Sequence, residues 1–330
     1  MSKLNNYKVV ATQIDGDWDI LVESSSSATP FALSSFVNAL HGNFRAFLCK
    51  KGDEIVAGCL IVLDDTEHNV VGHDLVVHDG IFFREFEKLN RAQKNSEQFK
   101  ALQCIAEFLA EEYSHIDLTL APMLTDVRAF QWVHYHDNQP MYQESIRYTS
   151  FVDIREFLDK KPLEDFTLYQ DASVSRRQEI RYGYRKGVKV FDSNDFERFI
   201  LLYKNTFERQ NIELENDLLI QMSKLLVSLY NDNRILMISA STTNDEVGSM
   251  AVFLMMADKA YYLFGANDYA LRNAHTGTAV LWQAFPFLAK KGIVSLDLEG
   301  VNSPDRGWFK MSFGATIQPY ISLTYRADKD

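Results

Sequence analysis

Cysteine and proline are scarce in this sequence, and each shortage excludes a class of protein. The 330 residues include three cysteines, Cys49, Cys59 and Cys104, which have no metal-ligand spacing. An odd, small number of thiols fits reduced cysteines in a cytoplasmic protein better than a disulfide framework. Seven prolines and 15 glycines exclude a collagen-like or proline-rich low-complexity chain. His134 and His136 lie two residues apart, but no cysteine or carboxylate spacing accompanies them, so we predict no metal site.

Long apolar runs and an excess of positive charge are also missing. Residues 1–18 lack the apolar core of a signal peptide, and no apolar run is long enough for a transmembrane helix. The net charge is −11, from 34 Lys and Arg against 45 Asp and Glu, which disfavours a DNA-binding protein. We therefore expect a cytoplasmic protein that binds no DNA and has no transmembrane segment.

What the chain does contain is enough apolar material for about two ordinary domains. Apolar residues make up 46 % and aromatic residues 13 % of the sequence. A polar stretch at 153–175 separates two segments with the same order of predicted elements. The first segment predicts a hairpin over 44–63, a helix over 96–113, and strands over 115–120 and 148–154. The second predicts a hairpin over 235–256, strands over 260–265 and 293–298, helices over 278–291 and 305–313, and a last strand over 317–325. These patterns predict two α/β (α+β) domains, over 1–155 and 156–330.

Matching residues in the two segments favour an internal duplication. Gly58 and Gly248 follow equivalent turns and lie 190 positions apart. Asp117 and Asp297 lie in equivalent strands, 180 positions apart, so one loop has changed length by about ten residues, which surface loops tolerate. The alternative is a coincidence between two ordinary α/β domains.

Three further helices are predicted between the two segments, over 174–190, 196–209 and 217–230. The first contains one acid, Glu179, and six basic residues: Arg176, Arg177, Arg181, Arg185, Lys186 and Lys189. This local excess of positive charge would attract a phosphorylated ligand such as a nucleotide sugar, a lipid-linked pyrophosphate, CoA or tRNA. The alternative is a solvated helix face that pairs with neighbouring acids.

The densest chemical signal is the segment 297–314. A strand ends in an acidic turn rich in Gly, Asn, Ser and Pro, and a short aromatic helix with one lysine, Lys310, follows. Ligands of α/β sheets bind beyond the carboxyl ends of strands, so Lys310 is a candidate oxyanion stabiliser or carboxylate anchor. Asp297 and Glu299 alternate along the strand and face the same side, which makes them candidate general bases. A solvated lysine and turn-capping carboxylates are the alternatives.

Other residues of this second segment are weaker candidates. His275 is a candidate general base or only a polar cap of the following helix. Tyr262, Trp308 and Phe309 are expected to line a sugar or acyl pocket, or else to divide between core and surface. Asn302 and Ser303, in the acidic turn, complete the candidate substrate-binding set.

Several motifs together resemble the Fem-type family, the aminoacyltransferases of peptidoglycan cross-bridges, and the related GNAT-like acyltransferases of polysaccharide clusters. The resemblance is strong over about 174–322 and thin over 30–154. The central motif is Asp-x-x-Gly at 297–300 followed by Trp-Phe-Lys-x-x-Phe-Gly at 308–314. The other matching segments are 30–36, 177–188, the Thr-x-x-Arg helix at 202–209, 261–266, and 281–284.

The resemblance implies two tandem GNAT-like domains, each a mixed, mostly antiparallel sheet flanked by helices. It also implies acyl transfer to an amine or hydroxyl. In the family, the lysine that matches Lys310 is associated with stabilising the reacting acyl group, and the arginine that matches Arg209 with a substrate phosphate. A surface ion pair with Glu208 or Glu213 is the alternative for Arg209. Arg181, Arg185 and Lys186 are expected to hold phosphate as well.

The acyl donor stays open between acyl-CoA and aminoacyl-tRNA. GNAT enzymes hold the CoA pyrophosphate at a helix N-terminus with a Gln/Arg-x-x-Gly-x-Gly/Ala motif. The matching stretch has Ala274 in place of Gln or Arg, so this motif is degenerate. The donor-binding candidates are Arg272, Gly277, Thr278 and Ala279. No tightly bound cofactor is expected.

The sequence therefore predicts an acyltransferase that transfers an N-acyl or aminoacyl group directly, without a covalent intermediate. The expected acceptor is a phosphate-bearing cell-envelope precursor, such as a sugar or lipid-linked intermediate, which is compatible with peripheral proximity to a membrane. One alternative is an aminoacyl-tRNA-dependent peptidoglycan bridge enzyme. Another, from a different class, is a non-catalytic, degenerate GNAT pair that binds a glycan precursor or a partner.

Overall fold

The computed structural model describes residues 6–327, and its contacts divide them into two compact units. The first unit comprises the residues up to 147 and those from 319 onward, and the second comprises Tyr148–Gln318. Both boundaries fall inside a strand, because β7 (Gln143–Asp153) and β13 (Thr316–Arg326) each contribute to both units. The domains expected from the sequence, 1–155 and 156–330, assign each of these strands to one domain.

The first unit is built on an antiparallel hairpin that the sequence predicts. Strand β1 (Tyr7–Thr12) pairs with β2 (Asn43–Lys51), β2 with β3 (Glu54–Leu63), and β3 with β4 (Asn69–Val70) and β5 (Gly80–Phe83). Strand β4 is parallel to β6 (His115–Thr119). The helical segments are α1 (Gly16–Glu23), η1 (Pro30–Ala32), α2 (Ser34–Val37), α3 (Arg91–Glu112) and α4 (Arg128–Gln131). The predicted helix over 96–113 is confirmed as α3.

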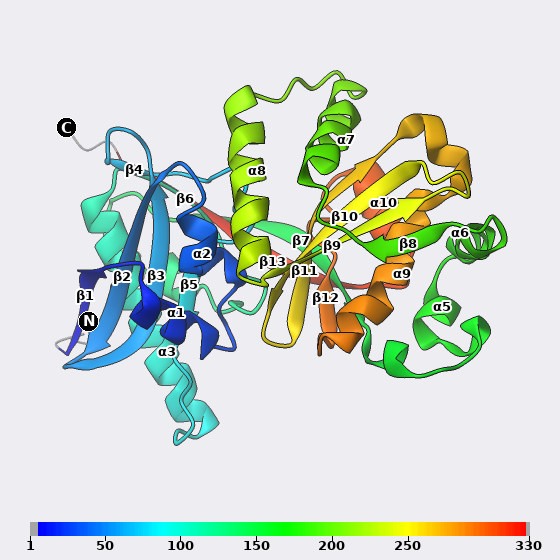
Figure 1. Cartoon of the computed structure of the whole chain (residues 1–330). Helices are drawn as coiled ribbons and strands as arrows, with labels where there is room; N and C mark the ends of the chain where they lie inside the picture. Colours follow the sequence, from blue (N-terminus) through cyan, green and yellow to red (C-terminus); the bar gives the residue numbers. More distant parts are fainter. Residues whose placement is uncertain (1–5, 328–330) are drawn as a thin grey trace. The chain divides into compact units, whose positions relative to one another are not determined.

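The second unit repeats this order around a hairpin of its own (Figure 1). Strands β8 (Lys189–Asp192), β9 (Ile235–Ser241), β10 (Val247–Met256) and β11 (Lys259–Asn267) are antiparallel neighbours, and β11 is parallel to β12 (Ser295–Asp297). The helical segments are η2 (Arg155–Leu158), η3 (Leu163–Asp165), α5 (Thr167–Asp171), α6 (Val174–Arg185), α7 (Phe196–Glu208), α8 (Asn216–Asn231), η4 (Tyr269–Ala274), α9 (Thr276–Lys290) and α10 (Pro304–Met311).

The two halves of the sequence exchange their last strands. Strand β7 ends the first half, but its residues 151–153 pair with β12 of the second unit. Strand β13 ends the second half, but its residues 322–326 pair with β6 of the first unit. Neither half of the sequence therefore contains all the strands of one unit.

The predicted helix over 174–190 is too long at its C-terminal end. Helix α6 ends at Arg185, and Gly187 has a φ of +66°, a left-handed conformation that glycine adopts without strain. The following residues form β8, which pairs with β9. Glycine after a helix is a stop signal, and here it outweighs the continuing pattern of basic residues.

A buried arginine ties α6 to α9 and α10. Arg176 is 8 % exposed, and its Nε donates a 2.8 Å hydrogen bond to Ser312. Its guanidinium group forms an ion pair with Glu179 at 2.5 Å, donates to the Thr278 hydroxyl, and lies 4.5 Å from the centre of the Phe309 ring. This arginine is therefore part of the core packing of the second unit.

Within residues 6–327, none of the helices combines the length and the apolar composition needed to cross a bilayer. Two separate apolar clusters form the cores, one in each unit. In the second unit, Trp282, Phe285 and Leu281 on α9 are among the fully buried side chains.

We predict that Arg176→Met lowers the free energy of unfolding by about 2 kcal/mol, because the substitution removes the hydrogen bonds of a buried guanidinium group to Glu179, Thr278 and Ser312. Urea unfolding followed by circular dichroism measures the change. The matched control is Arg185→Met, at an exposed position of the same helix, with an expected change below about 0.5 kcal/mol. Equal losses in the two variants would contradict the structural role of Arg176.

Candidate active site

The candidate active site lies where the parallel pairing of β11 and β12 stops. The last paired residues are Tyr261 and Asp297, and β11 continues beyond them to Asn267. After β12, the chain follows β7 instead, because the amides of Leu298 and Val301 bond to carbonyls of β7. The polar groups that follow a strand of this kind are placed at the edge where α/β sheets bind ligands.

Asp297 is buried at this point with one carboxylate oxygen in use. It is 1 % exposed, and its Oδ1 accepts hydrogen bonds from the Thr149 hydroxyl and, at 2.7 Å, from the Glu299 amide. Its Oδ2 has no hydrogen-bond partner among the described residues. Burial raises the pKa of Asp297 to about 6, although the bonds from Thr149 and Glu299 oppose the shift.

Glu299 occupies an unusual backbone conformation. Its φ is +65°, a region that side-chain-bearing residues rarely adopt and that costs about 1 kcal/mol or more. The side chain is 7 % exposed, and its Oε1 has no hydrogen-bond partner within the described chain. Burial, and then the nearby charge of Asp297, raise the pKa of this carboxyl well above its ordinary value. Glu299 therefore combines a strained backbone conformation with a buried carboxylate oxygen that has no hydrogen-bond partner among the described residues.

Lys310 supplies the positive charge of the site. Its Nζ lies 3.3 Å from the Gly300 carbonyl oxygen and 5.7 Å from the centre of the Tyr262 ring. Burial lowers the pKa of Lys310 to about 8, while Glu299 and Asp297 oppose the shift. The lysine is thus largely protonated at neutral pH.

Two glycines make room for this arrangement. Gly307 allows α10 to approach the preceding loop, because a Cβ at this position would lie 2.6 Å from the Val301 carbonyl oxygen. Gly265 on β11 leaves space for Tyr262, whose hydroxyl oxygen would lie 2.0 Å from an added Cβ. A side chain at either position would displace the elements that carry Lys310 and Tyr262.

The N-terminus of α9 forms the second part of the candidate site. Its N-cap, His275, has a φ of +61° and provides no side-chain cap in the described chain. Lys186 reaches this turn by donating to the Asn273 carbonyl oxygen. Burial and the charge of Lys186 lower the pKa of His275, which favours its neutral form. An uncapped helix start beside a lysine is suited to a phosphate group.

In the first unit, the corresponding helix start and strand end have hydrogen-bond partners within the protein. Helix α3 is the counterpart of α9, and its N-terminus is satisfied by a capping box of Asn90 and Gln93. Asp79 bonds to Thr119, the last residue of β6. Its Oδ2 accepts from the Thr119 amide, and its own amide donates to the Thr119 carbonyl oxygen at 2.7 Å. The open helix start is therefore a feature of the second unit.

Arg209, predicted to bind substrate phosphate, and Arg272, predicted to bind the donor, both lie against the ring of Tyr269. Arg209, at the end of α7, lies 4.7 Å from the centre of the Tyr269 ring, and Arg272 lies 4.2 Å from it. Neither has a carboxylate within ion-pair distance among residues 6–327, so the alternative of an ion pair with Glu208 or Glu213 is not what the structure shows for Arg209. No sequence signal singled out Tyr269 as their common support.

Other candidate residues have bonds within the protein. The Thr278 hydroxyl donates to Glu179 at 2.6 Å, and the Asn302 amide group makes two hydrogen bonds with the backbone of Tyr148. Ala279 is buried against α6, and Phe309 packs against Arg176. Their part in ligand binding stays a prediction.

The remaining candidates are spread over the surface. Ser303 is the N-cap of α10 and is exposed, Trp308 is 79 % exposed, and Gly277 lies against the Asn267 side chain. Arg181 and Arg185 line a separate cavity. Thr149 is a site residue without a signal in the sequence, because its role depends on the pairing of β7 with β12.

Comparisons with known proteins find a family match within the second unit and solved structures with a similar fold. Residues 174–308 match the model of the acetyltransferase (GNAT) domain. The solved structure of FemX superposes with a TM-score of 0.68 at 13 % identity, over 96 % of this chain and 97 % of that one. The chain has a Fem-type fold. No curated protein sequence matches it significantly.

Two further solved structures have a similar fold. The C-terminal domain of a putative lysylphosphatidylglycerol synthetase from Agrobacterium fabrum has a TM-score of 0.57 at 10 % identity, over 94 % of this chain and 91 % of that one. A tandem GNAT protein from the clavulanic acid biosynthesis pathway has a TM-score of 0.52 at 9 % identity, over 98 % and 100 %. The predicted Fem-type resemblance and the predicted pair of GNAT-like domains are confirmed at the level of the fold.

We predict a distinct pH dependence of stability for Asp297→Asn. A carboxyl with a raised pKa stabilises the folded state below its unfolded pKa and loses this contribution as the pH rises through its folded pKa. Between about pH 4 and pH 6, the free energy of unfolding of the wild type should therefore fall by about 2 kcal/mol relative to that of the variant. Urea unfolding at several pH values measures this difference. Parallel curves for the two proteins over this range would contradict the assignment.

Proposed function

We propose that the protein is a cytoplasmic acyltransferase that transfers an N-acyl or aminoacyl group to a phosphate-bearing cell-envelope precursor. The acceptor is an amino sugar or a peptidoglycan or polysaccharide intermediate, with an amine or hydroxyl as the reacting group. The observation that carries the proposal is the buried cluster of Lys310, Asp297 and Glu299 at the end of β12. A charged lysine and two carboxylates of raised pKa are costly to bury, and acyl transfer uses both kinds of group.

The cluster supplies the electrostatic and proton-transfer parts of a direct transfer. The acceptor amine attacks the donor carbonyl carbon, a C–N bond forms, and negative charge develops on the carbonyl oxygen. The Lys310 ammonium stabilises this oxyanion. The bond from the carbonyl carbon to the donor oxygen or sulfur then breaks, and the leaving oxygen or sulfur keeps the electron pair and takes up a proton from solvent. The proton that the attacking amine loses passes to the carboxylate of Glu299 or Asp297, since both have raised pKa values.

Cationic groups of the same unit are proposed to hold phosphate. Arg209 and Arg272 both lie against the Tyr269 ring, and guanidinium groups without carboxylate partners bind phosphate oxygens in pairs. Lys186 and the open start of α9 offer a second position for phosphate. FemX and the lysylphosphatidylglycerol synthetase domain have the same fold, which supports an envelope role.

We predict that Lys310→Met lowers turnover by about a hundredfold or more and leaves donor binding nearly unchanged, because an oxyanion donor acts in the transition state. Thermal unfolding with acetyl-CoA, CoA, UDP-GlcNAc and aminoacyl-tRNA in separate samples identifies the ligands. Turnover is then measured with the donor that stabilises the protein. Lys290→Met, at an exposed position near the end of α9, is the control. Turnover within threefold of the wild type would favour the non-catalytic alternative.

We predict that Arg209→Ala and Arg272→Ala each weaken binding of the phosphate-bearing ligand by about tenfold, since each removes a charged hydrogen-bond donor. Isothermal titration with the ligand identified above measures the affinity. Arg128→Ala, an exposed arginine of the first unit, should bind as the wild type does. Unchanged affinity in both site variants would place the phosphate elsewhere.

A further inference from the structure

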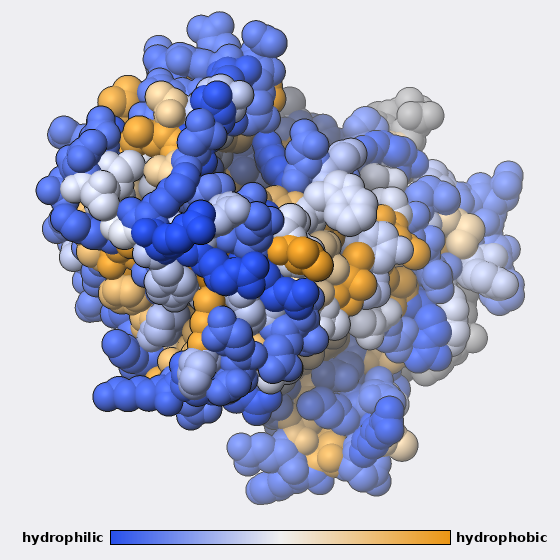
Figure 2. All heavy atoms as spheres, turned by 90° about the vertical axis from the view of Figure 1, so that its right-hand side faces the viewer, coloured by the Kyte–Doolittle hydropathy of each residue, from blue (hydrophilic) through white to orange (hydrophobic). Residues whose placement is uncertain are grey.

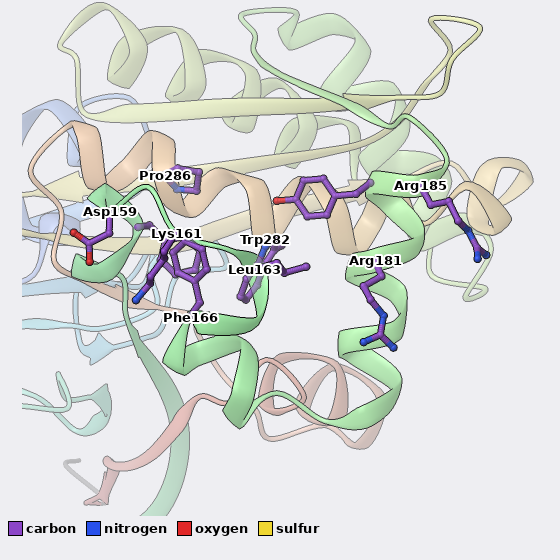
Figure 3. Close-up of a pocket in the computed structure, with 10 residues that line it drawn as sticks. Asp159, Lys161, Leu163, Phe166, Arg181, Arg185, Trp282 and Pro286 are labelled. Atoms are coloured by element: carbon purple, nitrogen blue, oxygen red, sulfur yellow. The ribbon is translucent and has the colours of Figure 1, made fainter.

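The second unit contains a cavity that the proposed transfer reaction does not use. It has a volume of about 730 Å³ and lies between α6, α9 and the segment of η2 and η3. Its apolar lining includes Trp282, Phe166 and Leu163, which Figure 3 shows close to one another. Four charged residues, Asp159, Lys161, Arg181 and Arg185, complete a lining that is otherwise apolar or aromatic, and a hollow of this size and composition is typical of a ligand site.

The walls of this cavity are held in place by several contacts. Phe157 and Phe166 stack with ring centres 4.8 Å apart, and Phe157 meets Trp282 edge-on at 5.2 Å. Glu156 accepts hydrogen bonds from the amides of residues 167 and 168 at 2.9 Å, which fixes the loop to α5. The cavity is thus formed by packed rings and not by a loose surface loop.

The structure also separates the six basic residues of 174–190 by role. Arg176 is buried, Lys186 bonds to the turn before α9, and Lys189 forms an ion pair with Asp245 at 2.7 Å. The remaining three form an arginine stripe, defined as Arg177, Arg181 and Arg185.

The arginine stripe runs along one face of α6, since its members are four residues apart and about 6 Å apart along the helix. None of the three has a carboxylate partner in the described part of the chain. Like charges at this spacing destabilise a helix by a few tenths of a kcal/mol each. Their partners within the second unit are neutral: Arg177 donates to the Gln170 carbonyl oxygen, Arg181 to the Tyr169 hydroxyl, and Arg185 lies over the Tyr182 ring.

The stripe and the cavity are adjacent, because Arg181 and Arg185 belong to the cavity lining. Figure 3 shows both guanidinium groups extending from α6 away from the aromatic rings, at the edge of the cavity. Large apolar side chains are exposed nearby, with Leu158 62 % and Tyr184 51 % exposed. The space-filling view from the side of α6 shows apolar patches beside strongly hydrophilic ones (Figure 2).

We propose that this cavity and the arginine stripe bind an anionic amphiphile, an apolar chain that carries a phosphate group. The chain occupies the apolar cavity, and the phosphate lies at its edge against Arg181 and Arg185. A purely ionic ligand would leave the exposed apolar surface without a function, and a neutral apolar ligand would leave the arginines without an anionic partner. This site does not depend on the proposed transfer reaction.

Titration of the full chain with dodecyl phosphate below its micelle concentration tests the proposal. Arg181→Ala/Arg185→Ala should weaken binding by about tenfold or more, because two charged donors are lost. The matched control is Arg45→Ala/Arg128→Ala, which removes two exposed arginines of the first unit and should not change the affinity. Equal affinities of the two double variants would overturn the proposal.

The apolar part of the site has its own variants. Leu163→Glu places a carboxylate in the cavity and should weaken binding by about tenfold or more. If this variant does not fold, Tyr184→Ala at an exposed position tests the same wall and should weaken binding by severalfold. Unchanged affinity in the folded variant would show that the chain does not enter the cavity.

Three further ligands separate this proposal from its competitors. Inorganic phosphate and dodecyl maltoside should each bind at least about tenfold more weakly than dodecyl phosphate, since each lacks one half of the amphiphile. Equal binding of either would overturn the proposal. Loss of tRNA binding in Arg181→Ala/Arg185→Ala, with dodecyl phosphate binding unchanged, would assign the stripe to RNA.

Vesicles distinguish the two sources of such an amphiphile. Sedimentation with phosphatidylcholine vesicles that contain phosphatidic acid, but not with phosphatidylcholine alone, identifies a lipid within a bilayer. This sedimentation should be lost in Arg181→Ala/Arg185→Ala. Binding of dodecyl phosphate without vesicle binding identifies a dispersed amphiphile, and either result supports the site.

Discussion

The second unit depends on the hydrogen bond from Thr149 to Asp297. This bond joins β7 to the end of β12 at the point where β11 and β12 cease to pair. It satisfies one oxygen of a buried carboxylate and leaves the other available, so that Asp297 and Glu299 keep unpaired oxygens beside Lys310. Burial without full pairing is costly, and it is also what shifts the pKa values of these groups toward neutrality. The cost and the reactivity of the cluster have the same cause.

The two units share an order of elements but differ at equivalent positions. Both units have a hairpin, a long helix, a short parallel strand and a closing strand. In the first unit, Asn90 caps the long helix and Asp79 occupies the end of the parallel strand. In the second unit, the equivalent positions are an uncapped His275 and the acidic loop after Asp297. The first unit has thus filled with its own side chains the positions that the second unit leaves open.

The sequence predicts the elements of this fold better than their partners. The hairpins, α3, α9, α10 and the central motif follow from apolar periodicity and turn residues, which act locally. The strand exchange is not predictable in this way, because β7 and β13 have the same alternating pattern whichever sheet receives them.

The basic segment shows the same limit. The sequence shows that the segment is strongly basic. Only the packing shows that Arg176 is buried, that Lys189 pairs with Asp245, and that Arg181 and Arg185 border a cavity. Roles that depend on a distant partner, such as those of Thr149 and Tyr269, leave no local signal.

The exchange of closing strands has a consequence for how the chain can be divided. A gene fragment that ends before residue 319 lacks the strand that lies beside β6, so the first unit loses an edge although its own half of the sequence is intact. A fragment that begins after residue 153 likewise lacks the strand beside β12. During synthesis, the first unit therefore stays incomplete until the residues of β13 that pair with β6 have left the ribosome.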